Sequence, residues 1–330
     1  MKSLPSADAI LSEDEAETVF STLLDGETSD AEIARFLTEL SDRGEKGSEI
    51  AGAARALRAR LIPIAAPDEA IDVCGTGGDG HHTLNVSTAV SLVVAAAGVP
   101  VAKHGNRAAS SKSGAADTLE ALGLDMEAAG RTAEKTLETL GICFLFAKNH
   151  HPAMGRIQPI RQKLGRRTIF NLMGPLSNPA GVKSQLIGIA RPAYVPIYAK
   201  AKAALGTTYT MIVSGDEGLD ELSLAGGSEI AHVRKNMFEM TRVDASVANL
   251  PSAPISAIRG GDATYNACQL KALLNGDTGP YRDAVIFNAA AAFLVAQKVD
   301  DWLEGAELAA RSLDYGAAAK LLQNWIEATQ

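Results

Sequence analysis

From Ile71 onward, short apolar runs alternate with longer segments of helical periodicity, and this alternation constrains the fold more than any other feature of the chain. It is typical of α/β units, in which largely parallel strands form a sheet that helices cover. We expect strands at 70–73, 99–102, 142–147, 185–189 and 209–213. We expect helices at 88–97, 115–122, 128–140, 195–205 and 284–296, with two more near the C-terminus.

The first 60 residues have a different, purely helical pattern. Ser12 with Glu15, and Ser29 with Glu32, are each spaced as capping boxes at helix starts. Apolar residues then recur at helical intervals in three stripes, within 19–24, 33–40 and 50–61. Short amphipathic helices rarely stand alone, so we expect these three to pack on another segment or on another subunit.

The length of 330 residues exceeds the usual size of one hydrophobic core, which favours two domains. We therefore expect a small helical domain at 1–68 and a large α/β domain at 69–330. Residues 148–183 hold several prolines and glycines and no clear strand, which predicts a crossing between the two.

Composition excludes some classes of partner. The net charge is −8, whereas binding to nucleic acid or to an anionic membrane surface needs basic patches. The three cysteines, Cys74, Cys143 and Cys268, are far apart and form no C-x-x-C pair, which indicates reduced thiols. The N-terminus lacks the make-up of a secretory signal, so we expect a cytoplasmic protein. We interpret Cys74 as a small buried spacer rather than a nucleophile.

The segment DVCGTGGDG, residues 72–80, is a candidate phosphate-binding loop. Glycines reach positive φ cheaply and let successive N–H groups approach an anion. Asn85, Ser87 and Thr88 follow directly and precede an apolar run, so a helix start offers a second anion site. Taken alone, such a loop could equally be an ordinary tight turn.

A polar segment follows the expected strand at 99–102. It contains two cations and several hydroxyl and amide side chains, namely Lys103, His104, Asn106, Arg107, Ser110 and Ser111. Open α/β sheets bind ligands beyond the carboxyl ends of their strands, and these groups suit a phosphorylated ligand. The alternative is a solvated loop with a helix cap.

Two further segments carry charged groups. SGDEGLDELS, residues 214–223, offers Asp220 and Glu221 in a glycine-broken loop, and carboxylates facing phosphates are typical of Mg²⁺ sites, although an acidic loop can be merely solubilising. Residues 150–181 supply His151 and several arginines. Arg161 could grip a carboxylate as a fork, whereas we interpret Arg166 and Arg167 as solvating a helix face.

Taken together in this order, the segments resemble the anthranilate phosphoribosyltransferases, which join anthranilate to phosphoribosyl pyrophosphate in tryptophan synthesis. The resemblance spans most of the chain and rests on GTGGDG, NVST, KHGNRAASSKSG, HPAM, the R-x-x-LG-x-RT-x-FN-x-x-GPL-x-NP run and GLDE. It implies a small helical lobe, completed by part of 155–182 and hinged to a large α/β lobe of the nucleoside phosphorylase and phosphoribosyltransferase type. It also implies homodimers formed through the small lobes.

The resemblance further implies roles for individual residues. Phosphoribosyl pyrophosphate would be surrounded by Gly75, Gly78, Asp79, Thr83, Asn85, Ser87, Thr88, Lys103, Asn106, Arg107, Ser110 and Ser111, with Ala115 beside them. Anthranilate would be held by Gly75, His104, Asn106, His151, Arg161 and Pro175. One or two Mg²⁺ ions would be bound by Ser87, Asp220 and Glu221. Ala115 stands where the family often has a serine, which removes one hydrogen bond, about 1 kcal/mol.

The implied reaction needs no covalent enzyme intermediate. Lys103, Mg²⁺ and the glycine-loop N–H groups would stabilise charge on the leaving pyrophosphate, and His151 would orient the amine or accept its proton. Two rivals stay open at this point: a pyrimidine-nucleoside phosphorylase of the same lobe plan, and a non-enzymatic relative that binds nucleic acid. The paired KHGNR and GLDE segments favour a pyrophosphate leaving group over the first, and the acidic net charge disfavours the second.

Overall fold

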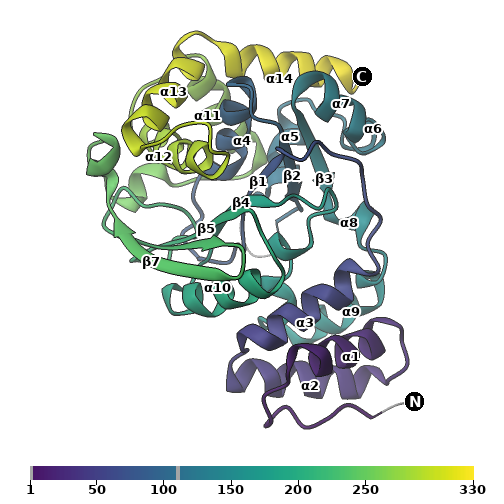
Figure 1. Cartoon of the computed structure of the whole chain (residues 1–330). Helices are drawn as coiled ribbons and strands as arrows, with labels where there is room; N and C mark the ends of the chain where they lie inside the picture. The colour runs from purple at the N-terminus through teal and green to yellow at the C-terminus, as the bar shows by residue number, and fades with distance from the viewer. Residues whose placement is uncertain (1–2, 109–111) are drawn as a thin grey trace.

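The structure is a computed structural model that describes residues 3–108 and 112–330. It has two lobes stacked end to end, a helical lobe at the N-terminus and a larger α/β lobe that carries the C-terminus (Figure 1). The expected fold class is confirmed, with a small helical N-terminal lobe and a mostly parallel central sheet.

The central sheet has seven strands in the order β3-β2-β1-β4-β5-β6-β7. The five expected strands are present and mutually parallel: β1 Ile71–Gly75, β2 Val101–Gly105, β3 Ile142–Phe146, β4 Ser184–Gly188 and β5 Tyr209–Gly215. Sequence analysis missed the antiparallel pair β6 Ser228–Arg234 and β7 Met237–Val243. Strand β7 is largely exposed at the sheet edge, so it lacks the apolar run that marked the buried strands.

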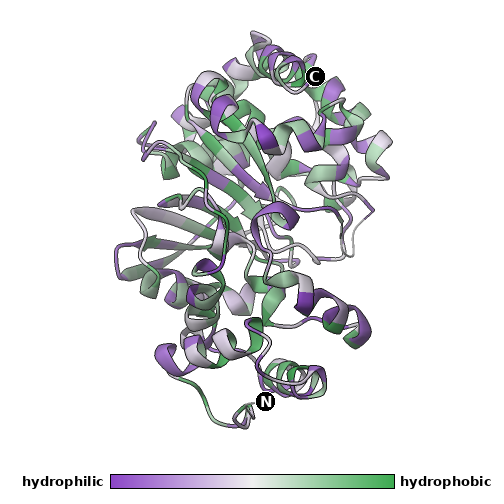
Figure 2. Cartoon of the chain, turned by 90° about the vertical axis from the view of Figure 1, so that its right-hand side faces the viewer, coloured by the Kyte–Doolittle hydropathy of each residue, from purple (hydrophilic) through white to green (hydrophobic). Residues whose placement is uncertain are grey.

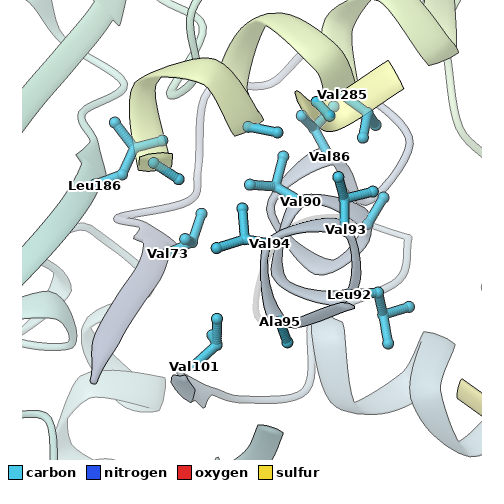
Figure 3. Packing of buried hydrophobic residues seen from close by; sticks show 14 of the residues in the cluster. Val73, Val86, Val90, Leu92, Val93, Val94, Ala95, Val101, Leu186 and Val285 are labelled. Atoms are coloured by element: carbon cyan, nitrogen blue, oxygen red, sulfur yellow. The ribbon is translucent and has the colours of Figure 1, made fainter. Parts of the chain in front are cut away.

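One face of the sheet is covered by α4 Val86–Ala96 and by helices from the C-terminal third. Figure 3 shows Val90, Val93 and Val94 of α4 packed among Val73, Val101 and Leu186 of the sheet and Val285 of α12. Ser87 and Thr88 lie in the first turn of this helix, because α4 begins two residues earlier than expected. The C-terminal helices are α11 Ala263–Leu274, α12 Pro280–Val295, α13 Trp302–Asp314 and α14 Ala317–Ala328. We did not expect α11, although Asp262 caps it in the ordinary way.

Shorter helices complete this lobe. The helix α5 Ala115–Ala121 and the helix α10 Val195–Ala204, on the opposite face of the sheet, agree with expectation. The expected helix 128–140 is wrong as a single element, because Thr132 leaves helical geometry and separates α6 Met126–Arg131 from α7 Ala133–Leu140. The short helix α8 Ala147–His150 follows β3.

The helical lobe consists of α1 Glu13–Leu24, α2 Asp30–Arg43 and α3 Gly47–Arg58, packed with α9 Met154–Leu164 from the crossing segment. The Ser12–Glu15 capping box is complete. The second box is wrong in part, since Ser29 caps α2 but the Glu32 carboxylate instead accepts from the Leu4 N–H and the Thr28 hydroxyl. We did not expect α9, which contains Pro159 and has no side-chain cap.

A continuous hydrophobic cluster joins the helical lobe to the sheet face that carries α10. It contains Phe20, which meets Phe36 and Phe170 edge to face at centroid distances of 6.0 and 5.9 Å, and it extends to Ile187 and Ile212 of the sheet. The side view in Figure 2 shows hydrophobic residues gathered in the strands and along the inner sides of the helices. Within the described residues, no helix has the length and apolar character needed to cross a membrane.

Candidate active site at the carboxyl edge of the sheet

The candidate site forms where β1, β2 and β5 end. Gly75, Gly105 and Gly215 are the last residues of these strands, so the segments that follow them meet at one edge of the sheet. This is the edge at which open α/β sheets bind ligands. Three of the four segments singled out in the sequence therefore converge.

The glycine loop and the acidic loop are in direct contact. The N–H of Gly77 donates to Oδ2 of Asp220 at 2.7 Å. Gly77, Gly78 and Gly80 all have positive φ, at 65°, 74° and 80°, which gives the loop the curvature of an anion nest. The Gly77 donor is taken by Asp220, whereas the N–H groups of Gly78, Asp79 and Gly80 make no hydrogen bond with another described residue. Those three N–H groups are the donors that remain for a phosphate.

The acidic loop also lies against the strand ends themselves. A Cβ added to Gly75 would collide with the Asp220 carboxylate, and one added to Gly188 would collide with the Asp220 backbone. The side chain of Asn288 on α12 then fixes a nearby residue, accepting from the N–H of Leu222 at 2.9 Å and donating to its carbonyl at 3.1 Å. The lack of side chains at two strand ends thus places Asp220 at the sheet edge.

We expect Gly75→Ala to lower turnover at least about tenfold. The new methyl group would collide with the Asp220 carboxylate and displace it, and small displacements of active-site groups lower the rate strongly. Steady-state kinetics and circular dichroism check this result. Gly155→Ala is the matched control, since a Cβ at Gly155 meets nothing within 4 Å. Full activity of Gly75→Ala would show that the position of Asp220 is unimportant.

Three carboxylates, Asp79, Asp220 and Glu221, are crowded at this edge of the sheet. Burial and the neighbouring Asp79 carboxylate raise the pKa of Asp220, and burial and Asp220 raise the pKa of Glu221. Oδ2 of Asp79 is buried with no hydrogen-bond partner among the described residues. Crowded carboxylates of this kind fit a divalent cation, which would relieve their mutual repulsion. Mg²⁺ commonly uses one or two carboxylates plus phosphate and water.

Ser87 connects this acidic group to Lys103. The Lys103 ammonium donates to the Val73 carbonyl at 2.8 Å and to the Ser87 hydroxyl at 3.3 Å, and the backbone of Ser87 lowers the pKa of Glu221. Lys103 is only 2% exposed, and burial lowers the pKa of its ammonium. Lys103 is therefore buried beneath the loops. There it donates to the Ser87 hydroxyl and lies close enough to Glu221 to lower the pKa of that carboxyl.

Two residues expected to grip the phosphoribosyl ligand are engaged within the protein. Oδ1 of Asn85 accepts from the Thr118 hydroxyl at 2.5 Å and from Nδ2 of Asn266 at 2.9 Å. The backbone of Thr83 pairs with that of Arg259 in an isolated antiparallel β-bridge. Thr88, in contrast, is 1% exposed, and its hydroxyl has no hydrogen-bond partner among the described residues.

The segment after β2 is only partly described. Asn106 and Arg107 lie at the surface beside the site, and Arg107 forms ion pairs with Asp117 at 2.9 Å and Glu120 at 2.7 Å. Ala115 is the first residue of α5 and packs toward Gly105. Ser110 and Ser111 lie outside the described residues.

Two histidines that are expected to contact anthranilate, His104 and His151, lie against each other at one end of the site. Nδ1 of His104 lies 2.9 Å from the Gly174 carbonyl, and Nε2 of His104 lies 3.2 Å from Nε2 of His151. Because a carbonyl only accepts, His104 carries its proton on Nδ1, and His151 then donates from Nε2. Nδ1 of His151 is left as an acceptor and makes no hydrogen bond with a described residue, although the Ser177 backbone near this ring raises its pKa slightly against the effect of burial. Pro175 is buried next to Gly174.

Burial holds both histidines neutral. It lowers the pKa of His104 to about 4 and, with the neighbouring His104, lowers the pKa of His151 to about 3. The unfolded chain takes up these protons below pH 6.5 while the folded chain does not, so the free energy of unfolding falls as the pH is lowered from 6.5. At about pH 5 we expect each histidine to lower the free energy of unfolding by about 2 kcal/mol relative to its value above pH 6.5. Urea unfolding at several pH values should show that His151→Gln loses less free energy of unfolding between pH 6.5 and 5 than the wild type. Equal losses for the two proteins would contradict a neutral, buried His151.

Arg161 is a half-buried cation without an acidic partner. It donates to Gln158 and Asn171, each at 3.3 Å, and lies 6.0 Å from the Phe170 ring centroid, and no described residue forms an ion pair with it. Burial lowers the pKa of its guanidinium. Such an arginine fits an anionic group supplied by a ligand.

The interpretation of Arg167 as a surface cation is wrong. It is half-buried and donates to the carbonyl of Gly78 at 3.1 Å, so it links the crossing segment to the glycine loop. Arg166 is exposed, as expected, but it lies beyond the end of α9 rather than on a helix face, and it pairs with Asp42 in the helical lobe. Asn288 was also missed, although a lone amide within the apolar run AVIFNAAAAF was a readable signal.

Comparisons with known proteins agree with this geometry. The model of the glycosyl transferase family α/β domain matches residues 67–319, and that of the same family's helical bundle domain matches residues 7–61. The chain is 74% identical over 327 residues to an anthranilate phosphoribosyltransferase of Erythrobacter litoralis, covering 99% of both chains. It is 66% identical to one of Novosphingobium aromaticivorans over 330 residues, the full length of both.

Solved structures give the same result. The crystal structure of anthranilate phosphoribosyltransferase from Thermus thermophilus matches with a TM-score of 0.92 and 41% identity, covering 97% of this chain and 96% of that one. The Saccharomyces cerevisiae enzyme in complex with PRPP and Mg matches with a TM-score of 0.87 and 31% identity, covering 99% and 93%.

Proposed function

Because this chain belongs to the anthranilate phosphoribosyltransferase family, we propose that the carboxyl edge of its sheet holds both substrates of that reaction through the residues described above. The enzyme transfers the phosphoribosyl group of phosphoribosyl pyrophosphate to the amine of anthranilate. The products are N-(5-phosphoribosyl)anthranilate and pyrophosphate, and the step belongs to tryptophan biosynthesis.

The observation that carries the assignment is the hydrogen bond from the Gly77 N–H to Asp220. It joins the phosphate-binding loop and the candidate metal carboxylates in one site. On the phosphoribosyl side, the N–H groups of Gly78, Asp79 and Gly80 would bind phosphate oxygens, and Asn106 and Arg107 would add contacts from the segment after β2. The family resemblance adds Ser110 and Ser111 to this set. Fixed dipoles of this kind stabilise charge on a leaving group without reorganisation.

We propose that Asp220, Glu221 and Ser87 hold Mg²⁺, as one or two ions. The complex of the yeast relative with PRPP and Mg supports the use of this metal, and the crowded, buried carboxylates of this chain fit it. When bound, Mg²⁺ would supply positive charge against the departing pyrophosphate. Lys103 would balance the same carboxylates from beneath.

On the acceptor side, the unpaired guanidinium of Arg161 would bind the anthranilate carboxylate. Nδ1 of His151 would accept a hydrogen bond from the amine, because the tautomer imposed by His104 and Gly174 leaves this nitrogen its lone pair. Gly75, Asn106 and Pro175 would bound the ring. Alignment of the two substrates supplies a large part of the rate, since holding reactants in line is worth roughly 7 to 11 kcal/mol.

The decisive assay follows anthranilate fluorescence. We expect the signal to be lost when the chain is mixed with anthranilate, phosphoribosyl pyrophosphate and Mg²⁺, and to persist when either of the last two is omitted. Phosphorolysis of thymidine or uridine, or a salt-dependent shift of DNA mobility without phosphoribosyl transfer, would instead favour one of the two rival activities.

We also propose a cytoplasmic homodimer that associates through the helical lobe, with α9 completing that lobe. The burial of Ile157 and Ile160 of α9 among α1, α2 and α3 supports the second point. Ile10 is 60% exposed on this lobe, as an interface residue would be in a single chain, and the three free cysteines suit a reducing compartment. Light scattering should give twice the chain mass, and Ile10→Glu should shift it toward the monomer.

A further inference from the structure

Three buried polar side chains form a connected row behind the acceptor end of the site. Asp72 on β1, Gln185 on β4 and Lys202 on α10 are 0%, 1% and 1% exposed. Asp72 and Gln185 are paired in register on adjacent parallel strands, so their side chains share one face of the sheet. Lys202 reaches that face from α10. None of the three belongs to the substrate contacts proposed above.

The amide of Gln185 is fully used. Its Oε1 accepts from the Lys202 ammonium, and its Nε2 donates to the Pro175 carbonyl at 2.7 Å and to Oδ2 of Asp72 at 3.3 Å. The amide oxygen thus faces the Lys202 amino group, whose pKa burial lowers to about 7, and the amide nitrogen faces a carboxyl group and a carbonyl. A reversed amide would set N–H groups against the Lys202 amino group and its oxygen against the Pro175 carbonyl and Asp72, so these three partners fix which way Gln185 points.

The row makes hydrogen bonds to the backbone of two residues of the proposed anthranilate subsite, His104 and Pro175. Oδ1 of Asp72 accepts from the backbone N–H of His104 at 3.2 Å, and Gln185 holds Pro175. The imidazole of His104 is bonded in turn to Gly174, the neighbour of Pro175. One buried row therefore secures both the strand that carries His104 and the turn that carries Pro175.

Stability alone does not account for this arrangement. Two charges withdrawn from water incur a desolvation cost that their mutual attraction seldom exceeds, and apolar replacements of a buried pair are often neutral or stabilising. Here Lys202 has a neutral amide as its only acceptor among the described residues. What the charges supply is orientation of a hydrogen-bonding group.

We propose that Lys202 is a positioning residue for the acceptor substrate, acting through Gln185 and Asp72 to hold Pro175 and His104 in place. This inference rests on the proposed function, since it takes His104 and Pro175 as part of the anthranilate subsite. The expected consequence is a defect confined to the acceptor substrate. Asp72 stands at the start of the 72–80 segment, but it lies in β1, and no hydrogen bond of the row reaches residues 76–80 or the acidic loop.

The test compares Lys202→Met with Gln185→Leu and with the double variant. We expect each single variant to raise the KM for anthranilate about fivefold to tenfold, equivalent to losing one buried hydrogen bond, while the KM for phosphoribosyl pyrophosphate changes less than about twofold. Because Lys202 acts through Gln185, the double variant should be no worse than Gln185→Leu alone. Lys200→Met, on the exposed side of the same helix, is the matched control.

Three outcomes would overturn the inference: an unchanged KM for anthranilate, an equal rise for both substrates, or effects that multiply in the double variant. Thermal unfolding separates these results from loss of fold. If Lys202→Met does not fold, Gln185→Leu carries the test through the same difference between the two KM values. A wild-type chain that forms no phosphoribosylanthranilate would refute the proposed function instead, before any variant is compared.

Discussion

Asp220→Asn should lower turnover about 100-fold and move the magnesium titration to higher concentration. Asparagine keeps an oxygen that can accept from the Gly77 N–H, so the loop contact can survive while the negative charge is lost. The estimate of about 100-fold is the usual effect of removing one electrostatic contributor at an active site. Steady-state kinetics over a range of Mg²⁺ concentrations would measure both changes.

The control for this variant lies in the same loop. Asp216 is exposed and ion-paired to Arg242 at 2.7 Å, so Asp216→Asn removes an equal charge without touching the proposed metal site. We expect near-normal activity and an unchanged magnesium requirement for Asp216→Asn. If Asp220→Asn titrates with Mg²⁺ like the wild type, Asp220 is not a metal ligand.

Arg161→Ala should raise the KM for anthranilate roughly 30-fold to 100-fold and leave the KM for phosphoribosyl pyrophosphate nearly unchanged. A charge-assisted bond to a carboxylate is worth about 2 to 2.7 kcal/mol, which corresponds to that range. Arg161 has no acidic partner within the described residues, so its removal leaves no protein carboxylate unpaired and should not destabilise the fold. Arg161→Lys should recover only part of the loss, because an ammonium cannot form the two-pronged contact.

Arg166→Ala is the matched control for Arg161. It lies on the same crossing segment but pairs with Asp42 in the helical lobe, and we expect little effect on either KM. A defect of Arg161→Ala on the phosphoribosyl side, or no defect at all, would remove Arg161 from the acceptor subsite.

The amino-acid sequence alone determined the fold class, the five parallel strands and the segments that meet at the site. Hydrophobic periodicity and capping residues act over a few neighbouring positions, and a glycine loop or an acidic loop is readable for the same reason. The errors arose where local signals are weak. The edge strand β7 is exposed, α9 contains Pro159, and Thr132 interrupts an otherwise continuous helical pattern.

Only the tertiary structure decided how the polar groups are shared. Asp220 accepts a hydrogen bond from the Gly77 N–H, although the two residues are 143 positions apart in the sequence. Arg167 contacts the glycine loop through the Gly78 carbonyl, which its surface-like sequence context did not indicate. The row of Asp72, Gln185 and Lys202 has no sequence signature, because its members come from two strands and a helix far apart in the chain. Hydrogen bonds and desolvation depend on distances of a few ångströms, which are set by packing of the whole chain and not by any local pattern of residues.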